Sequence, residues 1–507
     1  MSWFCAQIGA REHYAVPQAL HQSGRLAVLY TDFWAGSIWR RMGGSKLGVL
    51  RSLATRHHAE LEQRPGEPEP SKFQRSEFSV SGFSSSKAEI VSWNARALWW
   101  EILRKAESRE RSAERGAQGK QNRTQKTESS NVPASSSRPS AFERGEAGRD
   151  EDGGSKIEDG AGEHGFQLSV FNVSAFKNSG PYHGFIEVGR RFAIRVREDL
   201  KCRKELSRET IFYAYDTGAL EALEWCREHG VKCVLNQMDP NRVEVDLVRA
   251  EEKQWPGWTL ETVAVPEAYF ARREREWALA DRVVVNSKFS RQALLQQGVP
   301  PEKLVVIPLC YEAADSNRKS SGRSISSTLN YQPSTGPLRV LFLGQVILRK
   351  GIQYLIAAAK LLERENIHFD IVGPVGISAA ALVTAPKNMR FHGRTGRDQA
   401  AAWYRQSHLF VLPTLSDGFA ITQLEAMAHG LPVVTTPCCG EVVSDGVDGF
   451  VVPARDAGAL AEMFQRYLME PELLRSQSAA ALVKARQFTL ERLAENLRQL
   501  ENSLWKS

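Results

Sequence analysis

Short runs of apolar residues alternate along the chain with longer segments in which apolar residues recur every three or four positions. The short runs suit buried strands, and the longer periodic segments suit helices with one apolar face. In the first part of the chain this pattern predicts strands at 3–8, 26–30, 210–215, 232–235, 282–285 and 304–308, with helices at 11–22, 218–229, 266–280 and 291–297. Strands that alternate with helices indicate a parallel sheet covered by helices.

A second series of the same kind begins abruptly at residue 339. Its expected strands are 339–344, 369–372, 389–392, 409–412, 433–435 and 450–452, and its first helix is 352–365. We therefore expect an α/β protein with two doubly wound, Rossmann-like domains. Because such sheets bind ligands at the carboxyl ends of their strands, Gly344, Gly373, Pro413 and the loop around Gly440 are expected to face one crevice.

Two segments interrupt the pattern. Residues 104–165 are rich in Ser, Gly, Glu and Arg and hold few large apolar side chains, so they cannot bury enough surface to offset the entropy lost on ordering. We predict a disordered insertion there and a linker in the serine-rich segment 313–336. The resulting division is a first domain over 1–312, a second over 337–488 and a C-terminal helix over 489–507, for which packing back on the first domain is one interpretation.

The amino-acid composition limits the kinds of protein that the chain can be. The chain has 507 residues, of which 42% are hydrophobic and 25% charged, an ordinary globular balance. It contains no run of about 18 apolar residues, and its first residues lack the basic flank and apolar core of a signal peptide. We therefore expect a soluble, cytoplasmic protein. The 7 cysteines show no C-x-x-C pair and no histidine at metal spacing, which favours structural thiols and predicts no metal site.

The net charge of +7 is compatible with nucleic acid, an anionic membrane surface or phosphate-bearing substrates. No zinc-finger, basic-zipper or aromatic RNA-binding pattern accompanies the charge, which argues against nucleic acid. Residues 38–56 mix bulky apolar and basic side chains, and two interpretations stay open for them. One is peripheral contact with the inner face of a membrane, and the other is a helix pair packed on the first domain.

The candidate chemistry of the second domain begins after the expected strand 409–412. The sequence Pro-Thr-Leu-Ser-Asp-Gly-Phe at 413–419 predicts that Asp417 caps a helix running to about His429, with Gly418 allowing close approach of a ligand. The free amide groups and the dipole of such a helix start suit an anion such as a diphosphate.

Asp417 and Glu425 lie eight residues apart, which on a helix is about 80° of rotation and roughly 12 Å of rise. Both carboxylates can then border one elongated ligand such as a nucleotide sugar, one binding hydroxyls of the sugar and the other those of the ribose. The alternative is that Asp417 only caps the helix and that Glu425 lies on its solvated face. The apolar neighbours Leu424, Ala426 and Met427 make an unpartnered acid there unfavourable and support the binding role.

A second candidate element is the glycine-flanked loop at 344–351, which carries Arg349 and Lys350. It follows the first strand of the second domain, so we expect it at the same sheet edge as Asp417. Two adjacent cations are often only solvated surface, but at this edge Lys350 is positioned to meet a phosphate.

Together these motifs resemble those of the retaining glycosyltransferases of the glycogen-synthase-like superfamily, glycosyltransferase family 4, which have the two-domain GT-B fold. The matching sequences are Arg-Lys-Gly at 349–351, Asp-Gly-Phe-x5-Glu-Ala from Asp417, Gly440-Glu441, and Asp-Gly-Val-Asp-Gly-Phe at 445–450. The resemblance implies two domains that face each other across a cleft and a nucleotide-diphosphate-sugar donor. It also implies a hydroxyl-bearing acceptor, such as a glycan, a lipid-linked acceptor or a small molecule, and retention of the anomeric configuration without a metal or other cofactor.

The resemblance also implies roles for single residues. As catalytic residues, Asp417 is expected to contact the donor sugar, Glu425 the ribose, and Lys350 the diphosphate leaving group. The other donor-binding residues expected are Gly344, Arg349, Gly418, Phe419, Gly440 and Glu441. On the acceptor side of the first domain, Gly9, His13 and Asp216 are candidates, and His13 is equally suited to capping local structure.

Three positions differ from the family's usual pattern. Gln345 stands where most members have an arginine, Asp417 is one methylene shorter than the usual glutamate, and no histidine follows the expected strand at 232–235. These differences keep two alternatives open: a sugar-nucleotide-binding protein without catalysis, and a sugar-nucleotide epimerase.

Overall fold

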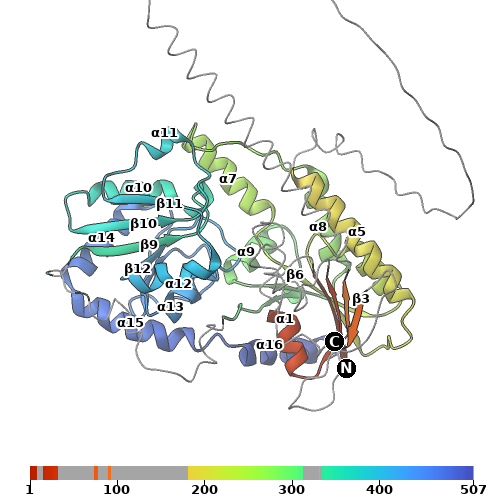
Figure 1. Ribbon diagram of the computed structural model, residues 1–507. Helices are drawn as coiled ribbons and strands as arrows, with labels where there is room; N and C mark the ends of the chain where they lie inside the picture. Colours follow the sequence, from red (N-terminus) through yellow and green to blue (C-terminus); the bar gives the residue numbers. More distant parts are fainter. Residues whose placement is uncertain are drawn as a thin grey trace, which may run out of the picture. The chain divides into compact units, whose positions relative to one another are not determined.

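The computed structural model describes residues 1–7, 15–31, 74–77, 89–92, 181–311, 331, 334 and 336–505. Two separate sheets lie in this part of the chain, each covered by helices (Figure 1). The expected insertion at 104–165, the candidate membrane segment at 38–56 and most of the expected linker at 313–336 lie outside the described residues.

The first domain is built on an eight-stranded sheet in the order β3-β4-β2-β1-β5-β6-β7-β8. Its strands are β1 (Ser2–Gln7), β2 (Leu26–Thr31), β3 (Gln74–Glu77), β4 (Glu89–Ser92), β5 (Thr210–Tyr215), β6 (Lys232–Gln237), β7 (Arg282–Val285) and β8 (Leu304–Val306). Neighbouring strands run parallel, except that β3 is antiparallel to β4. The expected strands of this domain all form, whereas β3 and β4 were not predicted.

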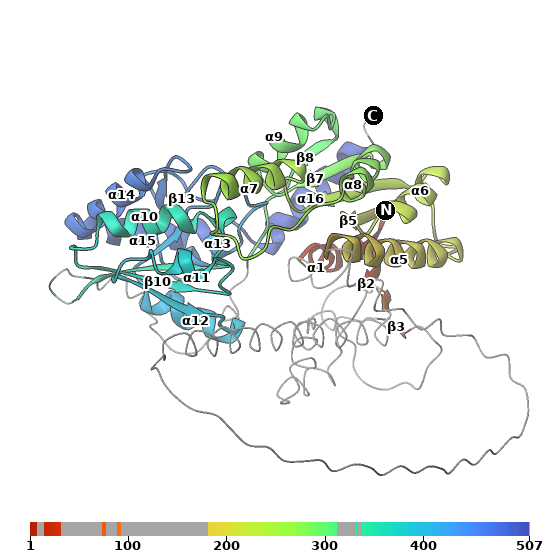
Figure 2. The same ribbon diagram turned by 90° about the horizontal axis from the view of Figure 1, so that it is seen from above.

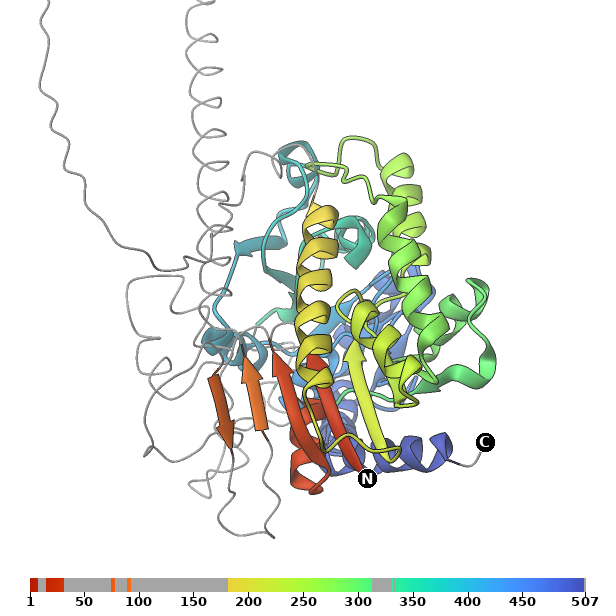
Figure 3. The same ribbon diagram turned by 90° about the vertical axis from the view of Figure 1, so that its right-hand side faces the viewer.

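Helices cover both faces of this sheet. They are α1 (Ala15–Gln22), α5 (Pro181–Lys201), α6 (Leu220–Glu228), α7 (Arg242–Gln254), α8 (Glu267–Leu279), α9 (Lys288–Gln296), the 3-10 helix η4 (Pro301–Lys303) and the C-terminal helix α16 (Leu490–Leu504). On one face, Phe192 of α5, Leu223 of α6 and Trp277 of α8 pack with the strands. Figure 3 shows α5, in yellow, lying along the strands of this face. Leu20 of α1 and Leu497 of α16 pack on the opposite face.

The C-terminal helix α16 thus belongs to the first domain's core. Its buried leucines recur every three or four residues, which gives the helix one apolar face. The hydroxyl of Thr489 caps the helix by accepting a hydrogen bond from the backbone N–H of Arg492. Glu501, which is buried, accepts hydrogen bonds from Trp3 Nε1 at 2.9 Å and Arg25 Nε at 2.8 Å. These contacts tie the last helix to the first strand.

The second domain is built on a six-stranded parallel sheet in the order β11-β10-β9-β12-β13-β14. Its strands are β9 (Leu338–Leu343), β10 (Ile367–Val372), β11 (Met389–Gly393), β12 (Leu409–Leu412), β13 (Val433–Thr435) and β14 (Gly449–Val451). Its helices are the 3-10 helix η7 (Leu348–Lys350), α10 (Ile352–Leu361), α11 (Ala379–Leu382), α12 (Arg397–Gln406), α13 (Thr422–Ala428), α14 (Ala457–Met469) and α15 (Pro471–Ala485). Helices α10 and α14 pack on one face, and α12, α13 and α15 on the other.

The strand order has its switch point between β9 and β12. The chain builds the sheet from β9 toward one edge and then returns to build from β12 toward the other. Such a switch point is where open α/β sheets bind ligands, in the crevice outside the carboxyl ends of the strands. The loop at 344–351 follows β9, and the segment at 413–419 follows β12. Both were selected as candidate ligand-binding loops from the sequence. The prediction of an α/β protein with two doubly wound domains is confirmed.

Helix α7 was not predicted, and its packing crosses the domains. It follows β6 of the first sheet, but Trp255 and Trp258 at its end pack on the core of the second domain. The carbonyl of Trp258 accepts a hydrogen bond from the N–H of Ser378 at 2.7 Å. Figures 1 and 2 both show α7 beside α10. A segment of the first domain is therefore fastened to the second.

Candidate functional site

The loop after β9 is held tightly against its neighbours at the switch point. Gly351 has a φ of 74°, and a Cβ there would overlap the carbonyl oxygen of Pro413 after β12. A Cβ on Gly373, which follows β10, would overlap the carbonyl oxygen of Gly344. Only glycine allows these approaches. The loops after β9, β10 and β12 are therefore in direct contact.

The contact between these loops brings two predicted site residues together. Lys350 Nζ forms an ion pair with Asp417 Oδ2, and both side chains are largely buried. Burial raises the pKa of the Asp417 carboxyl, but the charges of Lys350 and Arg349 outweigh this and hold the pKa below its usual range. Asp417 is thus an ionised carboxylate beside two cations.

The prediction that Asp417 caps a helix is wrong. Helix α13 begins only at Thr422, and the chain from Asp417 forms a turn in which Asp417 Oδ1 accepts the N–H groups of Phe419 at 3.3 Å and Ala420 at 3.1 Å. Ala420 has a φ of 64°, outside the helical region. An Asp side chain that accepts the N–H groups two and three residues further along the chain closes such a turn. The amide groups expected to meet a diphosphate are therefore already bound by Asp417.

Two glycines of the predicted site serve packing. A Cβ on Gly418 would overlap the carbonyl oxygen of Met238, which belongs to the first domain. A Cβ on Gly440 would overlap the ring of Phe419, and that ring is buried. Gly418 therefore lets the two domains approach each other, and Gly440 makes room for Phe419.

Glu425 and Glu441 bind partners other than Lys350 and Asp417. Glu425 Oε2 accepts a hydrogen bond from Tyr404 Oη of α12 at 2.8 Å. Both oxygens of Glu441 accept the backbone N–H of Lys288, at 2.9 and 3.1 Å, at the first residue of α9. Glu441 thus bridges the domains. Gln345 is exposed beside the basic loop.

Sequence reasoning missed Glu244, in the first turn of α7. Arg349 Nη1 lies 3.3 Å from Glu244 Oε2 and also donates to the carbonyl of Ser416 at 2.9 Å. Ser416 Oγ donates to the same Glu244 oxygen at 2.7 Å. The first domain thus supplies a carboxylate to the basic loop of the second. An acid in a polar helix carries no local signal of such a contact.

Helix α7 is held in place by Glu251, two turns further along. This side chain is 1% exposed and accepts hydrogen bonds from Gln353 Nε2 and Tyr354 Oη, each at 2.9 Å, and from Arg455 Nε at 2.6 Å. The three donors all come from the second domain. A buried carboxylate with charged and neutral donors fixes the position of the helix and hence of Glu244.

The acceptor-side candidate Asp216 is held through Oδ2, while its buried Oδ1 has no hydrogen-bond partner among the described residues. It is buried and forms an ion pair with Arg273, which also contacts Asp239 Oδ2 at 2.9 Å and Asn241 Oδ1 at 2.8 Å. Burial raises the pKa of Asp239, but Arg273 and the N–H of Asn241 lower it more, and the net pKa is below its usual value. Gly9 and His13, the other two candidates, lie outside the described residues.

The cysteines near the site lie in surroundings that suit a structural role. Burial raises the pKa of the Cys439 thiol to about 12, which leaves it protonated and unreactive. Within the described ranges, no three His, Cys, Asp or Glu side chains gather as they would around a metal ion.

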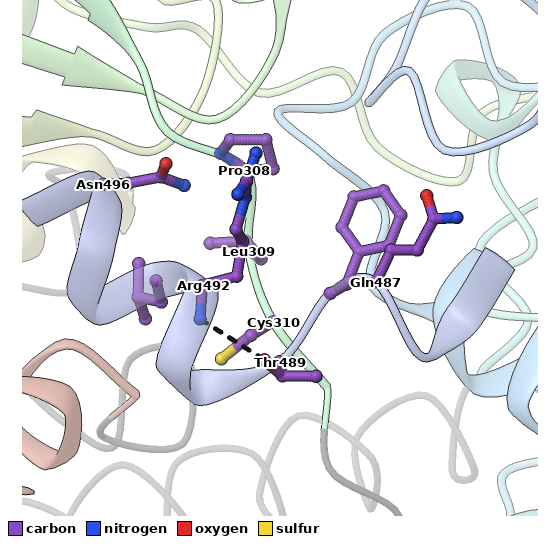
Figure 4. Close-up of a pocket in the computed structure, with 9 residues that line it drawn as sticks. Pro308, Leu309, Cys310, Gln487, Thr489, Arg492 and Asn496 are labelled. Atoms are coloured by element: carbon purple, nitrogen blue, oxygen red, sulfur yellow. Dashed lines mark hydrogen bonds between the residues drawn. The ribbon is translucent and has the colours of Figure 1, made fainter.

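A pocket of 580 Å³ lies elsewhere, where the chain leaves the first domain after β8 and returns to it before α16 (Figure 4). The N–H of Tyr311 donates to the carbonyl of Phe488 at 3.0 Å, so the two crossing segments run side by side. The lining residues are Pro308, Leu309, Cys310, Gln487, Phe488, Thr489, Arg492, Leu493 and Asn496. None of the predicted site residues lines it.

Known proteins with similar sequences give further information about this site. Residues 337–470 match the family described as Glycosyl transferases group 1. The chain is similar to the D-inositol 3-phosphate glycosyltransferase of Streptomyces griseus, with 29% identity over 214 residues, 39% of this chain and 45% of that protein. The chain spans about half the length of the curated relatives it matches.

Solved structures with some likeness include sucrose-phosphate synthase from Thermosynechococcus elongatus, with 21% identity and a TM-score of 0.46 over 65% of this chain and 82% of that one. Another is Anabaena HepE in complex with UDP and glucose, with 18% identity and a TM-score of 0.44 over 61% of this chain and 81% of that one. The resemblance to glycosyltransferases is confirmed by the family match of residues 337–470. Family 4 and the retaining mechanism stay predictions.

Proposed function

We propose that the protein is a glycosyltransferase that moves a sugar from a nucleotide-diphosphate-sugar to a hydroxyl acceptor with retention of the anomeric configuration. One observation carries this proposal: Arg349, Lys350 and Asp417 meet at the switch point of the sheet that matches the Glycosyl transferases group 1 family. A ligand at that point would face two cations and one ionised carboxylate. A phosphate group and a sugar hydroxyl are the partners that such groups bind best.

The cations would act on the leaving group. As the bond to the sugar breaks, negative charge grows on the diphosphate, and Lys350 and Arg349 would stabilise that charge. A well-placed donor of this kind contributes roughly 3 to 4 kcal/mol to lowering the barrier. The diphosphate itself would take the proton of the acceptor hydroxyl. With its charge stabilised by these two cations, the proposed reaction needs no metal ion.

The two acids would hold the sugar and the ribose. Two backbone N–H groups fix Asp417 Oδ1, so a sugar hydroxyl would bind Oδ2, the oxygen that contacts Lys350. Tyr404 holds Glu425 Oε2, so ribose hydroxyls would bind the other oxygen. Phosphate binding at Lys350 would at the same time release Asp417 for the sugar.

The acceptor would bind on the side of the first domain. A glycan, a lipid-linked acceptor or a small molecule would suit the proposed reaction, and a lipid-linked acceptor would suit a protein at the inner face of a membrane. No helix in the part of the chain that the structure covers is both long and apolar enough to cross a membrane.

A panel of nucleotide sugars tests the proposal. Thermal unfolding identifies the donor first, since a ligand at a hundred times its Kd stabilises the protein by about 2.7 kcal/mol. Hydrolysis and transfer are then measured with and without EDTA, and the anomeric configuration of the product is assigned by NMR. Stabilisation by a nucleotide sugar without hydrolysis or transfer to any acceptor would contradict the enzymatic proposal.

A sugar-nucleotide-binding protein without catalysis is the second candidate. It is favoured by the pairing of both cations with carboxylates, Lys350 with Asp417 and Arg349 with Glu244, and by the exposed, uncharged Gln345 beside them. The same panel separates the two candidates. Interconversion of the free sugar without an acceptor would indicate an epimerase instead.

A further inference from the structure

We infer that the Glu244 carboxylate occupies the subsite that the donor's diphosphate would take, and that it must leave Arg349 when a diphosphate binds. This inference rests on the proposed function, because it concerns the anion site of the same basic loop. It makes Glu244, a residue of the first domain, a determinant of donor affinity.

The geometry at Arg349 supports this step. Its Nη1 donates to the carbonyl of Ser416 at 2.9 Å and lies 3.3 Å from Glu244 Oε2. The first contact belongs to the fold of the second domain, and the second is made by a side chain that comes from α7. Glu244 therefore takes the place of an external anion on this guanidinium.

Charge balance makes this occupancy unfavourable for a diphosphate. Arg349 and Lys350 carry two positive charges, and Glu244 and Asp417 already neutralise them. A diphosphate brings further negative charges into a largely buried place, where like charges repel strongly. One carboxylate has to move away or take up a proton before the diphosphate binds well.

Glu244 is the carboxylate that can yield. Asp417 is fixed by the N–H groups of Phe419 and Ala420 in its own turn. Within the described part of the chain, the contacts that hold Glu244 both reach Oε2, from Ser416 Oγ at 2.7 Å and from Arg349. Because Glu251 anchors α7 two turns away, the Glu244 side chain can rotate while the helix stays in place.

Charged and polar groups of several elements face Glu244, and together with burial their net effect favours its protonation. They are Arg349 from η7, Asp417 from the loop after β12, Asp239 from the loop after β6, and the hydroxyl of Tyr182 from α5. Burial raises the pKa of Glu244, Arg349 opposes this, and Asp239 and Asp417 add to the rise, so the net pKa is above its usual value. A diphosphate at Arg349 would raise it further. Protonated Glu244 does not compete, so affinity for a diphosphate should increase as the pH falls.

Inorganic pyrophosphate is the probe that tests this inference, because it needs no knowledge of the base or sugar. Its binding to the full chain is measured by calorimetry for wild type, Glu244→Gln and the control Asp246→Asn. Asp246 is exposed on the same helix, and its ion-pair partner among the described residues is Arg249, at 3.6 Å. Thermal unfolding confirms that each variant is folded.

At about pH 8, Glu244→Gln should bind pyrophosphate about tenfold more tightly than wild type, a difference of about 1.4 kcal/mol. At about pH 6 the ratio should shrink, because a larger fraction of Glu244 in the wild type is protonated and does not compete. The ligand's own titration is common to both proteins and cancels in the ratio. Asp246→Asn should bind as wild type does.

Titrations in two buffers of different ionisation enthalpy should show that wild type takes up more protons on binding than Glu244→Gln. That comparison does not depend on the size of the affinity change.

Weaker binding by Glu244→Gln would overturn the inference, since Glu244 would then position Arg349 for the ligand. Equal binding and equal proton uptake would overturn it as well. The failure of the proposed function is a separate result: Lys350→Ala would bind pyrophosphate as tightly as wild type, or no nucleotide sugar would be turned over by any variant.

Discussion

Two ion pairs lie side by side in this protein and differ in origin. Lys350 and Asp417 both belong to the second domain and meet because the loops after β9 and β12 share a sheet edge. Arg349, the neighbour of Lys350, pairs instead with Glu244 on a helix of the first domain. One pair is set by a local fold, and the other depends on how a segment of one domain is fastened to the other.

The difference has a consequence for function. A pair built within one sheet keeps its geometry as long as that domain is folded. A pair across domains changes whenever the side chain from the other domain moves, so it can respond to a ligand or to pH. Substitutions that break each pair or its support should therefore differ in the size of their effect.

Substitution of Lys350 should have the largest effect. Lys350→Ala should lower kcat for sugar transfer by about 10² to 10³, because the leaving diphosphate loses a cation and Asp417 keeps an uncompensated buried charge. Lys360→Ala, which removes an exposed lysine at the end of α10, is the control and should leave kcat unchanged. Steady-state kinetics with the identified donor measures both. An unchanged kcat for Lys350→Ala would remove the basic loop from the mechanism.

Loss of Glu251, which anchors α7, should have the next largest effect. Glu251→Ala should destabilise the protein by about 3 kcal/mol, because Gln353, Tyr354 and Arg455 lose a buried acceptor. Denaturant unfolding measures the change, with Glu252→Ala on the same helix as the control. In the Glu251→Ala background, Glu244→Gln should no longer change the affinity for pyrophosphate, since α7 no longer presents residue 244 to Arg349. Stability equal to that of Glu252→Ala would show that α7 is not fastened by this contact.

Both pairs also show what could be predicted from the sequence. The strands of the second domain, and the placement of the loops of Lys350 and Asp417 at one sheet edge, follow from local apolar runs and the glycines that end them. The strand order and the ion pair between Lys350 and Asp417 were not predicted. The role of Asp417 as a helix cap was wrong, because its local turn with Gly418 competes with the helix and Phe419 is buried against Gly440. Glu244 could not be found, since its partners Arg349 and Ser416 lie more than a hundred residues away and nothing in the pattern of α7 places it on the other domain.

The second domain should also respond to acid through His408. Its Nδ1 accepts the N–H of Arg339 at 3.0 Å, and burial and the Arg339 charge lower the pKa of the ring to about 4. The folded state therefore holds a neutral ring, and the stability that this gives is present above the unfolded pKa of about 6.5 and lost as the pH falls toward 4.

The expected loss is about 3 kcal/mol between these pH values, measured by urea unfolding at a series of pH values. His408→Asn, whose side-chain oxygen can accept the same N–H, should remove this part of the pH dependence. His183→Asn, at an exposed position of α5, should keep it. An identical acid dependence in both variants would exclude His408 as its source.

The smallest effect is expected at Glu425, an acid that takes part in neither ion pair. Its Oε2 accepts from Tyr404 Oη, and the proposed ribose contact uses the other oxygen. Because the ribose does not change in the reaction, that contact is equally strong in ground and transition states. Glu425→Gln should therefore raise the KM for the donor by about tenfold and leave kcat nearly unchanged.

Tyr404→Phe, which keeps the carboxylate and removes only its internal partner, should change KM less. If Glu425→Gln lowered kcat as Lys350→Ala is expected to do, then Glu425 would act on the reacting centre, and the separation between the binding acid and the charged pairs at the switch point would not hold.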